Sequence, residues 1–272
     1  MTIILLFLIG VFAGILAGLL GVGGGLIFTP VLFYLFTQGG LDQPTQWAIG
    51  SSLFCTFIAS SSSVFKQYRN HNFFLFESLK VGGFGVIGTV IGTTVTTSGW
   101  YGAEQFSILF SALLLYAAWN LLYRKRKPKT ATPAETGSHK LTWLVALGIG
   151  VLGGMVASLA GVGGGIVLVP LMTLLLKLPF PMAVSISSGA IVVISTSAWL
   201  QMACANPVNE GITPLTLGFI DFGTALPLIA GSFAGGYLGV KIGHRIHTRL
   251  LEQIFAILLL FMALRLIYDS FL

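Results

Sequence analysis

The run Gly-Val-Gly-Gly-Gly occurs twice in this chain of 272 residues, at residues 21–25 and again at residues 161–165. The surrounding sequence repeats as well, because residues 14–32 and 154–172 are identical at 9 of 19 positions without a gap. Self-similarity of this kind indicates an internal duplication. We therefore expect two structural repeats, with the glycine run at an equivalent place in each.

Both glycine runs interrupt apolar sequence that is too long for one membrane crossing. As a single helix, residues 3–37 would be about 52 Å long, whereas the hydrocarbon core of a bilayer is about 30 Å thick. Residues 26–37 alone would reach only about 18 Å. A chain that turns at the glycines therefore forms a helical hairpin whose tip lies inside the membrane. We expect a second such hairpin over residues 141–176.

Composition places the chain in a membrane, since 55% of its residues are hydrophobic and only 8% are charged. We predict an all-α polytopic membrane protein with two inverted repeats, each a glycine-broken hairpin followed by three transmembrane helices. The further spans are expected at 47–65, 81–98 and 106–123, then at 182–202, in a segment that ends near 240, and at 253–271, with residues 72–79 as a short amphipathic connection. Residues 1–123 form the first repeat, 124–140 a basic cytoplasmic linker and 141–272 the second repeat.

Orientation follows from the basic residues, because cytoplasmic loops are enriched in Lys and Arg. If each hairpin adds two crossings or none, 12 of the 14 basic residues lie on one side, in loops 66–72, 124–140, 177–181 and 241–252. If each hairpin adds one crossing, 8 of these 12 basic residues lie on one side of the membrane and 4 on the other. We therefore expect cytoplasmic basic loops and both termini outside. The positive net charge then marks topology, not nucleic-acid binding.

Glycine-interrupted segments at matching places in two inverted halves indicate the substrate site of a transporter. Exposed amide groups and the start of the following helix favour an anion there. The candidate binding residues are Gly21, Gly23, Gly24, Gly25, Gly161, Gly163, Gly164 and Gly165. The alternative is that glycines only allow close helix packing, and we prefer that interpretation for Gly10, Gly14, Gly18, Gly88, Gly92, Gly231, Gly235 and Gly239. A nucleotide-binding loop is excluded, because no strand precedes the run and no Lys-Ser/Thr follows it.

The span after each hairpin opens with small hydroxyl residues. Serine hydroxyls can donate to anion oxygens without placing a fixed charge in the membrane, so the candidates here are Ser51, Ser52, Ser187 and Ser188. The alternative is that these hydroxyls cap helices or bond back to their own helix. We expect residues 60–63 and 195–197 to serve packing.

Two charged residues within apolar sequence, Asp221 and Arg265, are possible site groups. Asp221 is expected at an interface or a cavity, and Arg265 can also snorkel to the membrane surface. Cys55 and Cys204 are expected to be small hydrophobic residues. The sequence contains no nucleophile with a paired base and no metal-ligand spacing, so we predict neither an enzyme nor a cofactor. The expected partners are a small anion and the lipid bilayer.

The chain resembles the TauE/SafE sulfite exporter family at residues 14–30 and 154–170, which carry the two glycine runs and their following prolines. The resemblance extends to Ala-Ile-Gly-Ser-Ser at 48–52, Ala-Val-Ser-Ile-Ser-Ser at 183–188 and Asp-Phe at 221–222. The copies differ at Gly18 and Ser158, and Asn72 stands where the second half has Asp221.

This resemblance implies a multi-spanning permease of the plasma membrane (bacterial inner membrane) that moves sulfite, a sulfonate such as sulfoacetate, or another small organic anion, usually outward. Two alternatives stay open. One is an anion channel that uses the same hairpin tips as a filter. The other is a membrane-embedded sulfur-transfer enzyme with Cys55 or Cys204 as its carrier.

Overall fold

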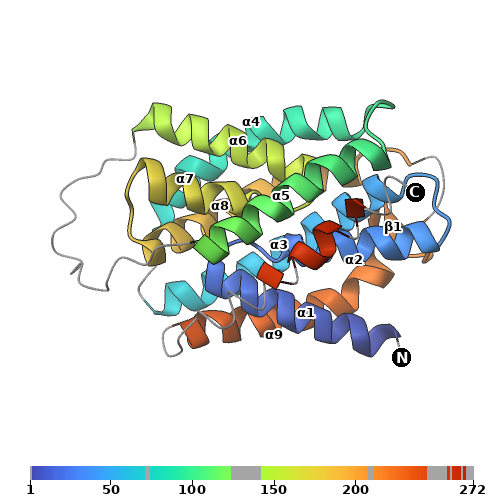
Figure 1. The fold of residues 1–272 in the computed structure, drawn as a ribbon, viewed down its shortest axis with the longest axis horizontal. Coiled ribbons are helices and arrows are strands. Elements are labelled where there is room, and N and C mark those ends of the chain that lie inside the picture. The colour runs from blue at the N-terminus through green and yellow to red at the C-terminus, as the bar shows by residue number, and fades with distance from the viewer. Residues whose placement is uncertain are drawn as a thin grey trace.

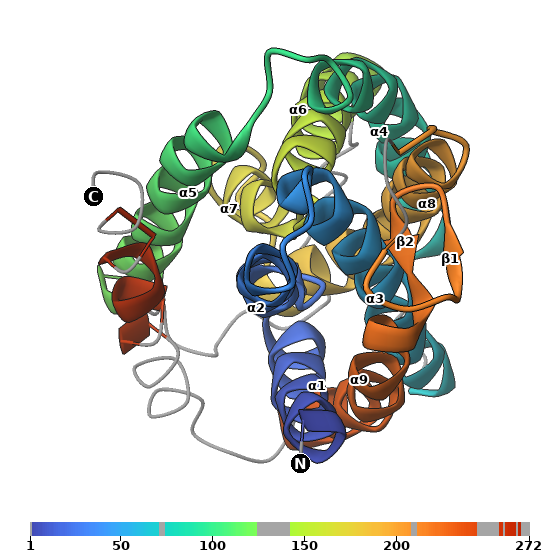
Figure 2. The same cartoon turned by 90° about the vertical axis from the view of Figure 1, so that its right-hand side faces the viewer.

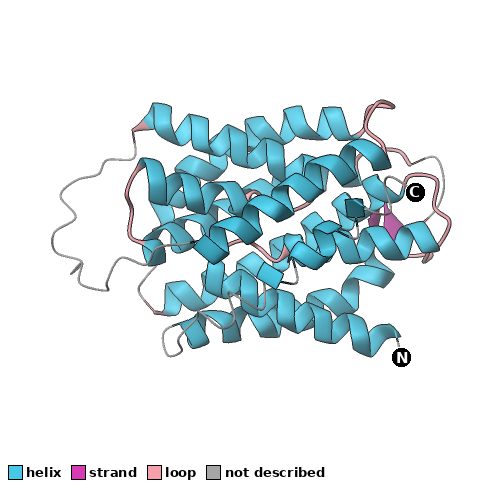
Figure 3. Ribbon diagram, viewed as in Figure 1, coloured by secondary structure: helices cyan, strands magenta, loops and turns pink. Residues whose placement is uncertain are grey.

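The computed structural model describes residues 2–70, 74–123, 142–207 and 211–243, together with 256–257, 259–264 and 266–267 near the C-terminus. Nearly all of this is helical (Figure 1; Figure 3). The first half contains α1 (Thr2–Leu20), α2 (Gly25–Gln38), α3 (Pro44–Arg69), α4 (Leu75–Thr96) and α5 (Ala103–Tyr123). The second half contains α6 (Trp143–Ala160), α7 (Gly165–Leu175), α8 (Phe180–Ala203), the antiparallel strands β1 (Thr216–Leu217) and β2 (Ile220–Asp221), and α9 (Phe222–Gly243).

Six of the described helices are long and apolar enough to cross a membrane by length and composition, namely α1, α3, α4, α6, α8 and α9. A helix suits this environment because it pairs its own backbone polar groups without water. By contrast, α2 has 14 residues and α7 has 11, whereas a full crossing needs about 20. The expected all-α polytopic fold is confirmed, and a short helix follows each glycine run.

Two glycine-lined seams join the halves of the chain. Along the first, α1 packs against α9, and a Cβ on Gly14 or Gly18 would collide with the backbone of α9. The collisions are mutual, since a Cβ on Gly235 would meet the backbone of Val11. Along the second seam, α4 packs against α6, where Gly88 lies against the Val151 carbonyl. Close packing is thereby confirmed for Gly10, Gly14, Gly18, Gly88, Gly92, Gly231, Gly235 and Gly239.

The seams interlock the two halves. The first helix of the first half lies on a helix of the second, and α6, the first helix of the second half, lies on α4 of the first. Neither half therefore buries its glycine faces alone. The proposed linker, residues 124–140, lies outside the described residues, and the boundaries of the two repeats stay a prediction.

The short helices α2 and α7 lie at the centre of the bundle, surrounded by the longer helices (Figure 2). Their side chains Phe28, Leu32 and Leu168 are fully buried. The two hairpins enter from opposite ends of the molecule, with α1 and α2 reaching in from the end that carries the N-terminus (Figure 1). Large apolar side chains such as Leu144 and Phe233 are exposed on the outer helices, as expected of surfaces that face lipid. Which face of the membrane each end occupies stays a prediction.

One detail differs from expectation. Helix α4 begins at Leu75, so residues 75–79 belong to this long helix and not to a separate amphipathic connection. Asp221, which was expected at an interface or a cavity, ends the small β-hairpin and lies immediately before α9. Asn72, which was compared with Asp221, lies outside the described residues.

Candidate functional site

The two glycine loops, residues 21–24 and 161–164, share an unusual backbone. Gly24 and Gly164 directly precede α2 and α7 with φ angles of 79° and 82°. This left-handed conformation costs other residues about 1–2 kcal/mol each, whereas glycine adopts it freely. Positive φ is also found at Gly21, Gly23, Gly161 and Gly163. The repeated sequence therefore encodes the same turn twice.

The two glycine loops touch one another. A Cβ built on Gly25 would lie 2.6 Å from the carbonyl oxygen of Gly161. Reciprocally, a Cβ on Gly165 would lie 2.6 Å from the carbonyl oxygen of Gly21. A side chain at either position would push the loops apart, which explains why each run ends in a further glycine. The structure thus brings the two sets of predicted glycines together.

Each glycine loop leaves amide groups without an acceptor. Gly24 and Gly164 have no side chain to cap the helices they precede, and neither helix has an acidic residue in its first turn. The first amides that bond within α2 are those of Ile27 and Phe28, which donate to the Gly24 carbonyl, and α7 repeats this pattern. Among the described residues, none accepts from the amides of residues 22–26 or 162–166. Buried amides are rarely left unpaired, and a helix start favours negative charge. Anion binding at this centre stays a prediction.

Two of the predicted serines tie the halves together. Ser52 donates to the carbonyl of Gly161 at 2.9 Å, and Ser187 donates to the carbonyl of Gly21 at 2.8 Å. Each bond joins the helix after one hairpin to the glycine loop of the other. Ser52 also accepts a 2.8 Å hydrogen bond from Thr29 of α2. In this arrangement both hydroxyls hold the loops and do not point a free proton at a ligand.

The other two predicted serines have separate partners. The Ser188 hydroxyl donates to the Val184 carbonyl in its own helix at 2.8 Å and accepts from Gln67 Nε2 at 3.3 Å. The Ser51 hydroxyl accepts from the backbone amide of Asp221 at 3.0 Å. A role in anion binding stays a prediction for all four serines.

Asp221 caps α9 and holds the preceding loop. Its Oδ1 accepts from the Thr224 amide at 3.0 Å and from the Thr213 hydroxyl at 2.6 Å, while its Oδ2 accepts from the Thr213 amide at 3.0 Å. A side chain before a helix commonly pairs an amide of the first turn in this way. The carboxylate is fully buried, and this capping role accounts for it. Arg265, the other possible site residue, lies outside the described residues.

Two residues that were not among the predicted site residues, Thr56 and Ile191, contact both loops. A Cβ on Gly23 of the first loop would lie 2.8 Å from Thr56 Cγ2 and 3.2 Å from Ile191 Cγ2. A Cβ on Gly163 of the second loop would lie 2.6 Å and 2.9 Å from the same two atoms. The Cβ on Gly23 would also lie 3.3 Å from the hydroxyl oxygen of Ser60, which was expected to serve packing. The sequence feature that could have indicated these residues is the four-residue spacing from Ser52, which places Thr56 and Ser60 on the same face of the helix.

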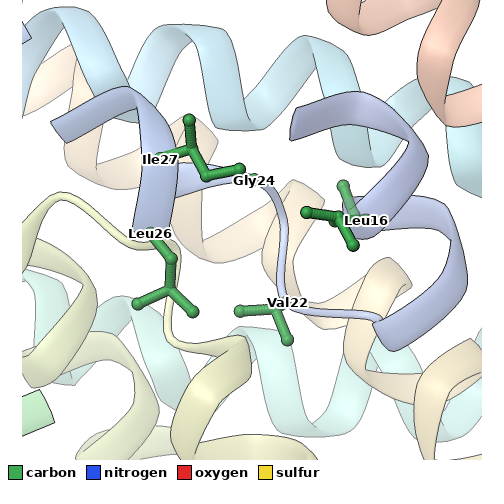
Figure 4. Close-up of a pocket in the computed structure, with 6 residues that line it drawn as sticks. Leu16, Val22, Gly24, Leu26 and Ile27 are labelled. Carbon is green, nitrogen blue, oxygen red and sulfur yellow. The ribbon is translucent and has the colours of Figure 1, made fainter. Parts of the chain in front are cut away.

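A small cavity lies beside the first glycine loop (Figure 4). Its walls are Leu16, Ala17, Val22, Gly24, Leu26 and Ile27. The cavity volume is about 10 Å³, which is close to the space that one water molecule requires. Because the two loops also contact one another, the structure shows them in a closed arrangement, and a polyatomic anion would have to separate them.

The two cysteines have different surroundings. Cys55 is buried in α3, with its Sγ 3.9 Å from the Ala225 carbonyl oxygen of α9. Cys204 is exposed at the C-terminal end of α8. Burial against a neighbouring helix is the usual setting of a structural cysteine.

Known proteins resemble this chain over nearly its whole length. The family described as Sulfite exporter TauE/SafE matches residues 6–266. A probable membrane transporter protein of Methanocaldococcus jannaschii is 29% identical over 96% of this chain and 95% of its own length. The probable membrane transporter protein YunE of Bacillus subtilis is 27% identical over 99% of both chains, and one from Haemophilus influenzae is 26% identical over 96% and 97%. No solved structure matches the chain. The chain therefore belongs to the TauE/SafE sulfite exporter family, and it is a multi-pass membrane transporter.

Proposed function

We propose that this protein is a secondary transporter that exports a small sulfur-containing anion, sulfite or an organosulfonate such as sulfoacetate, bound between the two glycine loops. The observation that carries this proposal is the meeting of two uncapped helix starts at the buried centre of the bundle. Each helix start is equivalent to about half a positive charge. Together they offer an anion roughly one charge and several amide donors without a basic side chain in the membrane. The choice of a sulfur-containing anion rests on the family's description as a sulfite exporter.

The ties between the halves suit alternating access. Ser52 and Ser187 each join a helix of one half to the glycine loop of the other. A movement of one half against the other would therefore break or form these bonds and change the distance between the loops. In the closed arrangement the loops exclude the substrate, and rocking opens the site to one side of the membrane at a time.

Outward transport of an anion requires no coupling ion when the cell interior is negative. Each elementary charge contributes about 2.3 kcal/mol per 100 mV of membrane potential. A divalent anion such as sulfite would thus be driven outward by the potential alone. A dependence of flux on potential, with no dependence on a proton or sodium gradient, would agree with this mechanism.

Uptake into liposomes that contain the purified protein tests the function. The panel is sulfite, sulfate, sulfoacetate, taurine and acetate, and we expect saturable movement of sulfite or sulfoacetate. Conductance without saturation would indicate a channel instead. A folded protein that moves none of the five would contradict the proposal.

A matched pair of substitutions tests the position of the site. Leu26 is buried in the first turn of α2 and lines the small cavity. Leu26→Asp would place a carboxylate among the unpaired amides and compete with the substrate, whereas Leu26→Asn has the same shape without the charge. We expect the Asp variant to lose transport and the Asn variant to retain more of it. Equal activity of two folded variants would place the site elsewhere.

A further inference from the structure

Polar side chains follow one face of α3 from the glycine loops to the end of the helix. They are Ser52, Thr56, Ser60, Ser63 and Gln67, and their spacing of three and four residues places them on one side. Thr56, Ser60 and Gln67 are 0%, 1% and 6% exposed. Nevertheless, Thr56 Oγ1, Ser60 Oγ and Gln67 Oε1 have no hydrogen-bond partner within the described ranges. Burying unpaired polar atoms is costly, which indicates that they meet water or a ligand during function.

Thr56 and Ser60 lie beside the first glycine loop, and Thr56 also lies beside the second. Thr56 Oγ1 lies 3.0 Å from the point where a Cβ on Gly25 would be, and Ser60 Oγ lies 3.3 Å from the corresponding point on Gly23. Gln67 is further along the helix and bonds through Nε2 to Ser188, which is next to the serine that holds the Gly21 carbonyl. The unpaired atoms therefore form a chain of polar groups from the loops toward the end at which α3 terminates.

The positions that correspond to these residues in the internal repeat are apolar or already paired. Ser52 corresponds to Ser187, because the two make the reciprocal bonds to the loops. Counting along α3 and α8 from this pair gives the other counterparts. They are Thr56 and Ile191, Ser60 and Ser195, Gln67 and Met202, and Ser188 and Leu53. Of the second set, only Ser195 is polar, and its hydroxyl bonds back to the Ile191 carbonyl in its own helix. The two halves thus share a backbone plan but differ in the chemistry beside their loops.

We propose, building on the anion site between the glycine loops, that the substrate reaches this site from the membrane face at which α3 ends, through a polar vestibule. The vestibule is formed by Thr56, Ser60, Gln67 and Ser188. The counterparts Leu53 and Met202 form an apolar barrier toward the opposite face, while Ile191, like Thr56, contacts both loops. The matching ligand is an oxyanion, since the hydroxyls of Thr56 and Ser60 donate to oxygen atoms.

Basic residues at the end of α3 support this direction of access. Lys66 and Arg69 occupy its last turn, and Arg69 is exposed. Positive charge at the mouth of a path with low-dielectric walls raises the local concentration of anions. The end of α8, near Cys204, has no basic residue in its last turn.

Cysteine accessibility tests the vestibule. In a protein with Cys55 and Cys204 replaced by alanine, Ser60→Cys and its counterpart Ser195→Cys are exposed in vesicles to the anionic thiol reagent 2-sulfonatoethyl methanethiosulfonate. We expect Ser60→Cys to react at least about tenfold faster, since an apolar path excludes a charged reagent. It should react only from the face that also labels Arg69→Cys. Equal rates, or faster reaction of Ser195→Cys, would overturn the proposal.

A second pair, Gln67→Cys and Met202→Cys, repeats the test if either serine variant fails to fold. Addition of sulfoacetate, a sulfonate that does not react with the thiol reagent, separates the vestibule from the proposed function. Protection of Ser60→Cys by sulfoacetate supports both. Fast reaction without protection supports the vestibule and contradicts sulfonate binding at the loops. Equal reactivity of both positions in vesicles that still export sulfite contradicts the vestibule and leaves the function standing.

Discussion

Replacing Ser52 and Ser187 separately by alanine should expose an asymmetry in how the two glycine loops are held. Ser187→Ala removes one interhelical hydrogen bond and leaves the Gly21 carbonyl without that donor. Ser52→Ala removes two bonds, the one to the Gly161 carbonyl and the one from the Thr29 hydroxyl. Thr29 is fully buried, so its hydroxyl cannot turn to water. The Ser52 variant should therefore be the less stable of the two.

The size of the difference follows from bonds of this kind in other membrane proteins. An interhelical hydrogen bond there contributes about 0.6 kcal/mol on average and about 1.7 kcal/mol at most. Ser187→Ala should thus lower the free energy of unfolding by about 0.6–1.7 kcal/mol, and Ser52→Ala by about twice as much. Ser63→Ala is the control, because this hydroxyl bonds only to the Ala59 carbonyl of its own helix and its loss should cost little.

Equilibrium unfolding in mixed detergent micelles, followed by far-ultraviolet circular dichroism, gives the three free energies. A double variant, Thr29→Ala with Ser52→Ala, should be less than additive relative to the two single variants, because they share one bond. If Ser52→Ala and Ser187→Ala lower the free energy of unfolding no more than Ser63→Ala does, these two serines do not hold the loops. If Ser52→Ala and Ser187→Ala lower the free energy of unfolding equally, only the predicted difference between the two loops is wrong.

Three further predictions concern other parts of the protein. Gly164→Ala should lower the free energy of unfolding by about 2–5 kcal/mol, because the left-handed φ of this residue and the backbone of α6 both oppose a Cβ. Gly148→Ala is the control. Open space surrounds Gly148, so this change should raise the free energy of unfolding by about 0.5–1 kcal/mol in the same assay. Burial raises the pKa of Tyr101, so the folded protein keeps a proton that the unfolded chain releases above about pH 10. Stability should therefore hold below about pH 10 and fall as the pH rises further, with a weaker fall in Tyr101→Phe. Finally, joint replacement of Cys55 and Cys204 by alanine should leave sulfite flux in liposomes intact, and its loss from a folded protein would favour the sulfur-transfer alternative.

Much of the fold could be predicted because the glycine runs are so unlike their surroundings. Consecutive glycines inside apolar sequence must break a helix, and Gly24 and Gly164 do so with the same φ. The small-residue spacing on α1 and α9 likewise indicated close packing. Which helices pack together could not be predicted. Long-range shape complementarity brings α1 onto α9 and α6 onto α4, and a spacing pattern does not encode it.

The site was predicted in its backbone but less well in its side chains. The sequence shows that Ser52 and Ser187 have hydroxyls, but only the structure shows that the opposite loop accepts from them. Thr56 was missed because a single threonine in a transmembrane helix is usually a packing residue. Asp221 was predicted at an interface or a cavity. Its role as the cap of α9 could not be predicted, because its partner Thr213 comes before a turn that the sequence did not reveal.

Binding of an anion between the glycine loops can be tested at the amides themselves. Valine is followed by glycine at three places in the chain, residues 22–23, 81–82 and 162–163. Labelling valine carbonyls with ¹³C and glycine amides with ¹⁵N therefore isolates the NMR signals of Gly23, Gly82 and Gly163. On titration with sulfite, or with whichever anion the liposome assay selects, we expect the signals of Gly23 and Gly163 to shift saturably and that of Gly82, within α4, to stay unchanged. Signals of Gly23 and Gly163 that do not respond to a transported anion would contradict the account.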